Sequence, residues 1–237
     1  MGNEVRRDMR KVTQDTSLKG FYRATSMADE DWWSELWPDP EGVLRKVGLA
    51  PGMKAVDLCC GYGWFTAPMA RIAGPEKVVG VDLDPRMIEA AREHVRRQGA
   101  PECRWITGDA SSIDEQLSEA VDFILVANVF HGVPDRTALA ACAARRLKPG
   151  GRLVIINWHA LPREETRVLG EPRGPLSELR MTPEQTRRDV EPAGFRLSEI
   201  VELKPYHYAA IFLKEQGGAQ LTESSQSSSP SKRAVER

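Results

Sequence analysis

The sequence predicts an α/β fold, in which a doubly wound and mostly parallel sheet is covered by helices on both faces. Three observations predict it. Short apolar runs alternate with helical stretches between residues 54 and 157, as in a chain of βαβ units. The runs are apolar at consecutive positions, which is typical of parallel strands buried on both faces. Polar residues follow successive runs where each strand would end, and α/β sheets bind ligands at that edge.

The alternating region contains five predicted strands and four predicted helices. We expect strands at 54–58, 77–82, 103–107, 123–127 and 152–157. We expect helices at about 64–73, 85–98, 112–118 and 135–147. The run Lys148-Pro149-Gly150-Gly151 stops the last of these helices and turns the chain into the fifth strand.

The last third of the chain departs from this alternation. Thr182-Pro183-Glu184-Gln185 has the residues of a helix N-cap, its first position and its capping partner, so a helix should run to about residue 193. Gly194 then ends it. Two strand-like runs follow at 195–203 and 208–213, joined by only four residues. A connection this short cannot cross over, so these two strands pair antiparallel.

The two ends of the chain differ from the centre. Residues 1–50 are expected to form a helical cap, in which Trp33 and Trp37 lie four residues apart on one helical face. Residues 51–215 form the core, with an insertion at 160–181 on the substrate side. Residues 216–237 are rich in Gly, Ser and Gln, and we expect a disordered tail there because too little apolar surface can be buried.

Composition narrows the functional classes. The formal net charge of the 237 residues is −1, so a nucleic-acid partner is disfavoured. We found neither a run of about 18 apolar residues nor the apolar stretch of a signal peptide, which predicts a cytoplasmic protein without a membrane partner. The four cysteines match neither a disulfide framework nor a CxxC metal pair, and we expect small, buried, reduced side chains.

The first predicted strand runs into a glycine-containing turn, Asp57-Leu58-Cys59-Cys60-Gly61-Tyr62-Gly63-Trp64. Gly61 and Gly63 would let the backbone approach a ligand closely. A dinucleotide-binding turn would need a further glycine at position 66, where this chain has Thr66. The turn therefore favours an adenosine ligand without a diphosphate.

Three further polar positions follow the next three strands. Asp82 ends the second strand about twenty residues after the glycines, where a carboxylate can accept hydrogen bonds from both ribose hydroxyls. Asp109 ends the third strand and can accept from an adenine amino group, while Leu83 covers a face of the ring. Asn128 follows the fourth strand. A single aspartate in such a turn is as often a turn or cap residue as a ligand-binding residue. Such residues at the ends of four successive strands together indicate a nucleoside site.

These residues carry a resemblance to a known family. The runs at 56–63, 80–84, 108–110 and 147–151 resemble the motifs of class I S-adenosylmethionine-dependent methyltransferases. The resemblance covers about residues 43–214 and implies a Rossmann-like seven-stranded sheet of order 3-2-1-4-5-7-6, with the last strand antiparallel. The implied cofactor is S-adenosylmethionine, without a metal ion.

The resemblance also assigns residues to parts of the cofactor. Those assigned to its methionine end are Asp57, Gly61 and Gly63, and Cys59 of the same turn is also assigned to the cofactor. Asp82 would hold the ribose; Leu83, Asp109 and Ala110 would surround the adenine. Asn128 would lie beneath the sulfonium. One departure is that Cys59 stands where the family has its first glycine.

Candidates for the chemical step lie at the same edge. Methyl transfer needs a positioned acceptor and, for many acceptors, a base. His131 follows the fourth strand and His159 follows the fifth. His207 lies in the turn between the last two strands, with Tyr206 beside it. The alternative is that each histidine only bonds a backbone group. His94 lies within a predicted helix, and we expect it to face solvent.

The acceptor pocket needs a cover. The tryptophans of the cap, with Phe21 and Tyr22, are one candidate; the alternative is that they only pack the first helix on the sheet. The insertion is the other. It carries Arg163, Arg167, Arg173 and Arg180. We expect most of these arginines to be solvated, with the clamping of an anionic acceptor as the alternative.

The sequence thus predicts methyl transfer to a small-molecule acceptor through sulfur, oxygen or nitrogen. An RNA or protein methyltransferase is an alternative, although Asn128 is followed by Val129, Phe130 and His131 rather than by the proline-rich run of amide and base-amine methyltransferases. A non-catalytic cofactor-binding protein is the third. The oligomeric state is left open.

Overall fold

The computed structural model describes residues 30–215. The predicted tail at 216–237, the first 29 residues of the predicted cap, and with them Phe21 and Tyr22, lie outside the described residues.

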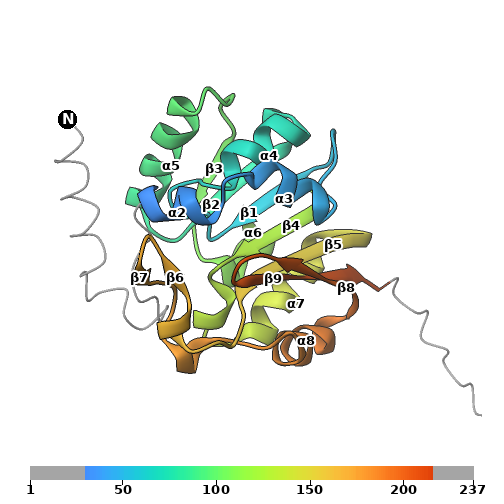
Figure 1. Ribbon diagram of the computed structural model, residues 1–237. Helices are drawn as coiled ribbons and strands as arrows, with labels where there is room; N and C mark the ends of the chain where they lie inside the picture. The colour runs from blue at the N-terminus through green and yellow to red at the C-terminus, as the bar shows by residue number, and fades with distance from the viewer. Residues whose placement is uncertain (1–29, 216–237) are drawn as a thin grey trace, which may run out of the picture.

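A seven-stranded sheet forms the centre of the structure (Figure 1), in the order β3-β2-β1-β4-β5-β9-β8. The strands are β1 (Ala55–Leu58), β2 (Val78–Asp82), β3 (Arg104–Thr107), β4 (Val121–Ala127), β5 (Leu147–Trp158), β8 (Phe195–Leu203) and β9 (His207–Lys214). Strands β1 to β5 pair in parallel, and β9 is antiparallel to both β5 and β8. The predicted fold class and strand order are confirmed, since the sixth and seventh predicted strands are β8 and β9.

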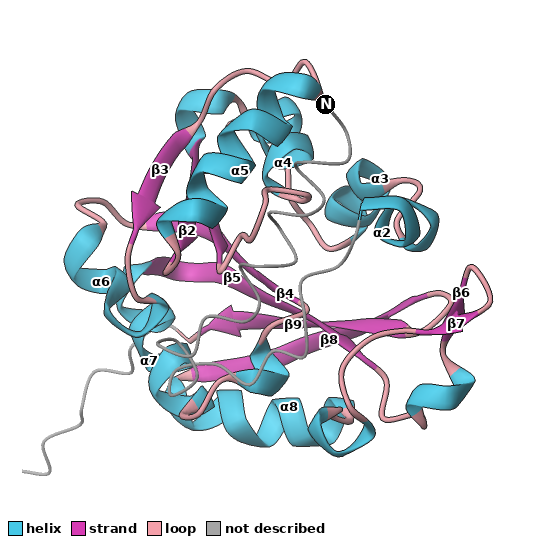
Figure 2. Ribbon diagram, turned by 90° about the vertical axis from the view of Figure 1, so that its left-hand side faces the viewer, coloured by secondary structure: helices cyan, strands magenta, loops and turns pink. Residues whose placement is uncertain are grey.

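Helices cover both faces of the sheet (Figure 2). One face carries α2 (Glu30–Leu36), α3 (Pro40–Lys46), α4 (Thr66–Ala73) and α5 (Pro85–Arg97). The other carries α6 (Ile113–Gln116), α7 (Arg136–Arg146) and α8 (Pro183–Val190). Side chains alternate between the two layers: on β5, Ile156 packs with α2 to α4, whereas Ile155 packs with α7. A doubly covered sheet of this kind is the arrangement that the consecutive apolar positions predict.

Local sequence explains where several helices begin. Thr182 accepts from the backbone N–H of Gln185 and the Gln185 side chain accepts from the N–H of Thr182, which is a complete capping box. Asp84 caps α5 in front of Pro85. Gly194 has a left-handed backbone after α8 and the short turn that follows it. The predicted boundaries of α8 and of the last two strands rest on these residues.

Two features of the structure differ from the predicted elements. Strand β5 starts five residues earlier than expected, because Leu147 pairs with Val121; the register then shifts, with the extra residues on the β5 side, before Phe123 pairs with Arg152. The insertion contains a small hairpin of β6 (Arg167–Val168) and β7 (Glu171–Pro172), which the sequence did not indicate. This hairpin lies beside α2.

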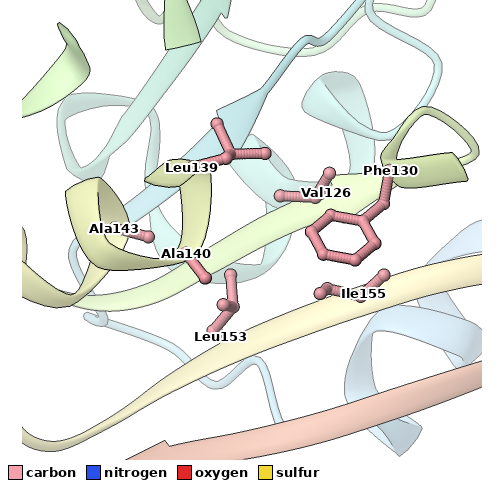
Figure 3. Close-up of a pocket in the computed structure, with 7 residues that line it drawn as sticks. All are labelled: Val126, Phe130, Leu139, Ala140, Ala143, Leu153 and Ile155. Atoms are coloured by element: carbon pink, nitrogen blue, oxygen red, sulfur yellow. The ribbon is translucent and has the colours of Figure 1, made fainter. Parts of the chain in front are cut away.

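The core between α7 and the sheet contains a small packing gap (Figure 3). Its walls are seven apolar side chains from β4, β5, α7 and the turn after β4, and they leave no room for a water molecule. The gap is therefore part of the core packing. In residues 30–215, no helix is long and apolar enough to cross a membrane.

Candidate cofactor and acceptor site

The turn after β1 is fastened to the end of β2. The backbone N–H of Gly61 donates to Asp82 Oδ2 at 2.9 Å, and the N–H of Cys60 donates to the carbonyl of Val81 at 2.9 Å. The second oxygen of Asp82 accepts from the N–H of Asp84 at 3.0 Å. The carboxylate thus holds the first turn and the start of α5 together at the carboxyl edge of the sheet.

Left-handed backbone recurs at this edge. Cys59 and Asn128 have φ angles of 62° and 60°, and Gly61 and Gly63 have 54° and 83°. Such angles are unfavourable for residues with a Cβ, and those that persist cluster at functional sites. A Cβ on Gly63 would lie 3.0 Å from the Cβ of Ala91. Gly63 is therefore required where the turn packs against α5, in addition to any approach to a ligand.

Asp57 is almost completely buried below the turn. Its carboxylate accepts from Thr66 Oγ1 at 2.5 Å. Burial raises the pKa of Asp57 to about 7, and the Thr66 hydrogen bond offsets part of that rise. A buried carboxyl group with such a pKa gains or loses its proton near neutral pH, and groups with shifted pKa values of this kind cluster at functional sites.

Asp82 and Asp109 have different surroundings. Burial raises the pKa of Asp82, and its hydrogen bonds to the N–H groups of Asp84 and Gly61 oppose that rise. Asp109 is half-buried and accepts from the N–H and the hydroxyl of Ser111 at 2.8 and 2.5 Å. Asp109 therefore caps a short turn, as the alternative for a lone aspartate anticipates. Each carboxylate keeps lone pairs for a ligand, since an ionised carboxylate can accept about four hydrogen bonds.

The three carboxylates surround one residue. Burial raises the pKa of the Cys59 thiol, and the charges of Asp82, Asp57 and Asp109 raise it further. Leu83 is 38% exposed next to Asp82, while Ala110 and Asn128 are half-buried at the ends of β3 and β4. The nine residues expected around a cofactor are thus brought to one edge of the sheet. Cys59 and Cys60 are half-buried in this turn, rather than buried like Cys103 and Cys142.

The three candidate histidines also converge. His207 pairs with Trp158 across β5 and β9, which places it at the carboxyl edge. It is 1% exposed, and its ring lies 4.2 Å from that of Trp158 and 4.5 Å from that of Trp37. Burial lowers the pKa of His207 well below its usual value, and the charges of His159 and His131 add to this effect.

His131 and His159 have contrasting environments. His131 lies in the turn at Phe130–Gly132 and is buried, which lowers its pKa to about 4 despite the nearby Asn157. His159 is half-buried, and its Nε2 lies 2.9 Å from Glu202 Oε2. Tyr206 donates its hydroxyl to the carbonyl of Arg167 and stacks on Trp158. Tyr206 therefore fastens the insertion to the last turn of the sheet.

His94 was expected to face solvent, and this expectation is wrong. Its ring is 2% exposed, because Tyr62 and Trp64 lie against it with centroids at 5.4 and 5.6 Å. Glu30 of α2 approaches its Nδ1 at 3.9 Å. The aromatic residues of the cofactor turn were the signal available in the sequence, since they need a partner on α5.

Helix α2 extends across the carboxyl edge. At one end Glu30 meets His94 and Arg97 of α5. Past the other end, the ring of Trp37 contacts His207 and lies 5.4 Å from Phe65. The tryptophans therefore do both things that were considered: they pack on the sheet, and they cover the edge where the histidines lie.

The arginines of the insertion are not mostly solvated, contrary to expectation. Arg180 is 5% exposed, Arg163 and Arg173 are half-buried, and Arg167 is exposed. The Arg173 guanidinium lies 5.3 Å from the Trp32 ring centroid, and that of Arg180 lies 5.1 Å from the centroid of Trp158. The reason is that the loop turns its backbone carbonyls toward Arg163 and Arg180, while Trp32 and Trp158 from outside the loop offer aromatic faces to Arg173 and Arg180. Arg180 is the residue that sequence reasoning underrated.

Within residues 30–215, no three His, Cys, Asp or Glu side chains are grouped so that they could hold a metal ion.

Comparisons with known proteins agree with this geometry. A family of methyltransferase domains matches residues 55–151. Demethylmenaquinone methyltransferase of Geobacillus stearothermophilus is 30% identical over 115 residues, which are 48% of this chain and 49% of that protein. The chain thus spans about half the length of the curated relatives it matches.

Solved structures extend the likeness over more of the chain. An S-adenosylmethionine-dependent methyltransferase from Aquifex aeolicus has a TM-score of 0.64 at 24% identity, covering 87% of this chain and 97% of that one. Magnesium protoporphyrin IX methyltransferase from Synechocystis, with bound S-adenosylmethionine, has a TM-score of 0.56 at 16% identity, covering 78% and 90%.

The fold is that of the class I S-adenosylmethionine-dependent methyltransferases. Residues 55–151 match the methyltransferase-domain family, and they contain Asp57, Asp82 and Asp109 together with the turn that joins them.

Proposed function

We propose that this chain transfers the methyl group of S-adenosylmethionine to a small-molecule acceptor. The observation that carries the proposal is the convergence of Asp57, Asp82 and Asp109 around the left-handed turn at Cys59. The matched family and the named activities of the relatives support it.

The chain fits the cofactor in its chemistry. Asp82 uses two of its lone-pair positions on backbone N–H groups and keeps others for the two ribose hydroxyls. Leu83, Asp109 and Ala110 would surround the adenine. Asp57, Cys59, Gly61 and Gly63 would surround the methionine end, and Asn128 would lie beneath the sulfonium. When bound, the cofactor supplies an electrophilic methyl group.

The protein would position the acceptor, exclude water from it and accept its proton. The aromatic cover from α2 excludes water from the edge where His207 and Trp158 lie. Among the candidate bases, His159 has the geometry of a base held by an orienting carboxylate, because Glu202 bonds its Nε2. His131 and His207, kept neutral by burial, would line the acceptor. Tyr206 supports them by fastening the insertion.

Isothermal calorimetry with S-adenosylhomocysteine tests the cofactor site. Asp82→Ala should bind this product at least about 100-fold more weakly, since it loses charge-assisted hydrogen bonds to two hydroxyls, about 1.5–3 kcal/mol each. Asp122→Ala is the matched control: Asp122 also accepts from a backbone N–H, that of Lys54 at 2.9 Å, but at the start of β4. It should keep wild-type affinity.

Three results would contradict this proposal. If the wild-type protein gave no heat of binding with S-adenosylhomocysteine, the proposed cofactor would be wrong. Equal losses in Asp82→Ala and Asp122→Ala would show that Asp82 acts only on the fold. Tight cofactor binding without release of S-adenosylhomocysteine across a panel of thiols, phenols and aromatic acids would indicate a binding protein instead.

A further inference from the structure

Arg180 is a buried cation that leaves one of its three donor nitrogens unused. It lies before α8, at the end of the insertion, and is 5% exposed. Its Nε donates to the carbonyl of Pro175, and its Nη2 donates to Thr166 Oγ1 and the carbonyl of Arg173, at 3.1, 2.8 and 3.0 Å. Its Nη1 is buried without a hydrogen-bond partner. The guanidinium is thus held in place by neutral groups.

Arg180 forms no ion pair in the described part of the chain. No carboxylate between residues 30 and 215 lies within ion-pair distance of it. Burial and the neighbouring Arg163 lower the pKa of Arg180, and the charge of Glu164 offsets only part of that effect, but a guanidinium stays protonated in proteins. Removing such a charge from water without a paired anion is costly. The missing component is therefore an anion.

The surroundings of Arg180 form a polar site with aromatic walls. Its guanidinium lies over the ring of Trp158, which also contacts His207. Both ring nitrogens of His207 and the Nδ1 of His131 are buried without hydrogen-bond partners. Trp158 thus contacts both Arg180 and His207, and the Arg180 charge lowers the pKa of both imidazoles. Three unsatisfied buried side chains at one place indicate an absent ligand.

The neighbours of this site are aromatic. The rings of Trp37 and Trp158 lie 4.5 and 4.2 Å from that of His207, and aromatic side chains favour aromatic, planar partners. None of these residues belongs to the set assigned to the cofactor. Trp158 ends β5 and His207 begins β9, and β5 lies next to β4, after whose end Asn128 is assigned to the sulfonium.

We propose that the acceptor is a small planar organic oxyanion, a carboxylate or an ionised phenol, whose negative oxygen pairs with Arg180 between the insertion and β5. The proposal rests on the proposed function, because it names the acceptor class of that site. Arg180 is a recognition residue here, and the neutral imidazoles of His207 and His131 complete the hydrogen bonds of the ligand.

The test compares two ligands that differ in charge. The full chain, saturated with S-adenosylhomocysteine, is titrated calorimetrically with 2-naphthoate and with 2-naphthamide, and the pair benzoate and benzamide covers a smaller site. The acid should bind at least 10-fold more tightly than its amide. Arg180→Gln should bring this ratio close to one, whereas Arg167→Gln, an exposed arginine of the same insertion, should leave it unchanged. Adding 2-naphthol distinguishes a phenol site from a carboxylate site.

A second measurement keeps the test valid if Arg180→Gln unfolds. In the wild-type protein alone, 2-naphthoate should raise the thermal midpoint, and neither 2-naphthamide nor sodium chloride at equal ionic strength should do so. Equal effects of acid and amide, equal effects of chloride, or no binding of any of these aromatic compounds would overturn the proposal. Loss of S-adenosylhomocysteine binding would instead overturn the proposed function, and the two failures are therefore distinguishable.

Discussion

At the scale of single residues, Cys59 shows how one position can depart from a family pattern and still keep the geometry. Where the family has its first glycine, this chain has a cysteine with a φ angle of 62°. A left-handed backbone costs a residue with a Cβ about 1–2 kcal/mol. The turn nevertheless forms, because Asp82 bonds Gly61 and Val81 bonds Cys60 from the neighbouring strand.

This geometry predicts an unusual substitution series. Cys59→Gly should leave the free energy of unfolding within about 1 kcal/mol of wild type, because the relief of the left-handed backbone offsets the larger entropy of the unfolded glycine. Cys59→Val should lower it by about 2 kcal/mol, since a β-branched residue is least tolerated there. Urea denaturation measures both. Equal stabilities for Gly and Val would mean that residue 59 is not left-handed in solution.

At the scale of elements, α2 is a short helix that connects distant parts of the site. Glu30 approaches His94 of α5, and Trp37 after its end contacts His207 of β9. Seven residues form too short a helix to be stable alone. Its position therefore depends on the buried aromatic contacts.

Trp37→Ala should release α2 from the sheet. Truncation of a buried tryptophan costs about 3–5 kcal/mol. Here we expect this loss to weaken the packing of α2 on the sheet rather than the whole fold. Hydrogen exchange should become much faster in residues 30–37, while β4 and β5 keep their protection. Trp105→Ala is the control, because Trp105 of β3 packs beside Gly80 of β2, away from α2. Unchanged exchange in α2 of Trp37→Ala would contradict this role.

The elements also show what a sequence can predict. The strands, the capping box at Thr182 and the turn at Gly194 depend on residues close in the chain, and the structure has them where local chemistry indicates. The edge residues could be found because parallel strands bring their ends together. The burial of Arg180 could not, since it depends on a contact with Trp158, which is distant in sequence. For His94 the aromatic residues of the turn were a signal, but the residue that they would pack against depends on contacts distant in sequence.

At the scale of the whole molecule, the buried site couples stability to pH in two opposite directions. His131 has its pKa lowered to about 4 in the folded state, whereas an exposed histidine titrates near about 6.5. Between these values the unfolded chain binds the proton and the folded one does not, so His131 reduces stability as pH falls from about 6.5 to 4. Asp57, with its pKa raised to about 7, binds its proton first in the folded state and increases stability over the same fall.

The effects of His131 and Asp57 should therefore be distinguishable by measuring the free energy of unfolding at several pH values. His131→Asn should flatten the loss of unfolding free energy between pH 6.5 and 4, by up to about 1.4 kcal/mol per pH unit, since its proton uptake on unfolding disappears. Asp57→Asn should steepen that loss, because its compensating protonation is removed. Urea titrations at several pH values give both slopes. Parallel curves for the wild type and His131→Asn would mean that the imidazole is accessible to solvent in the folded protein. If instead the Asp57→Asn variant gave the flatter curve, Asp57 would be ionised in the folded state. Its carboxylate would then have a cationic partner, or a hydrogen-bond donor besides Thr66.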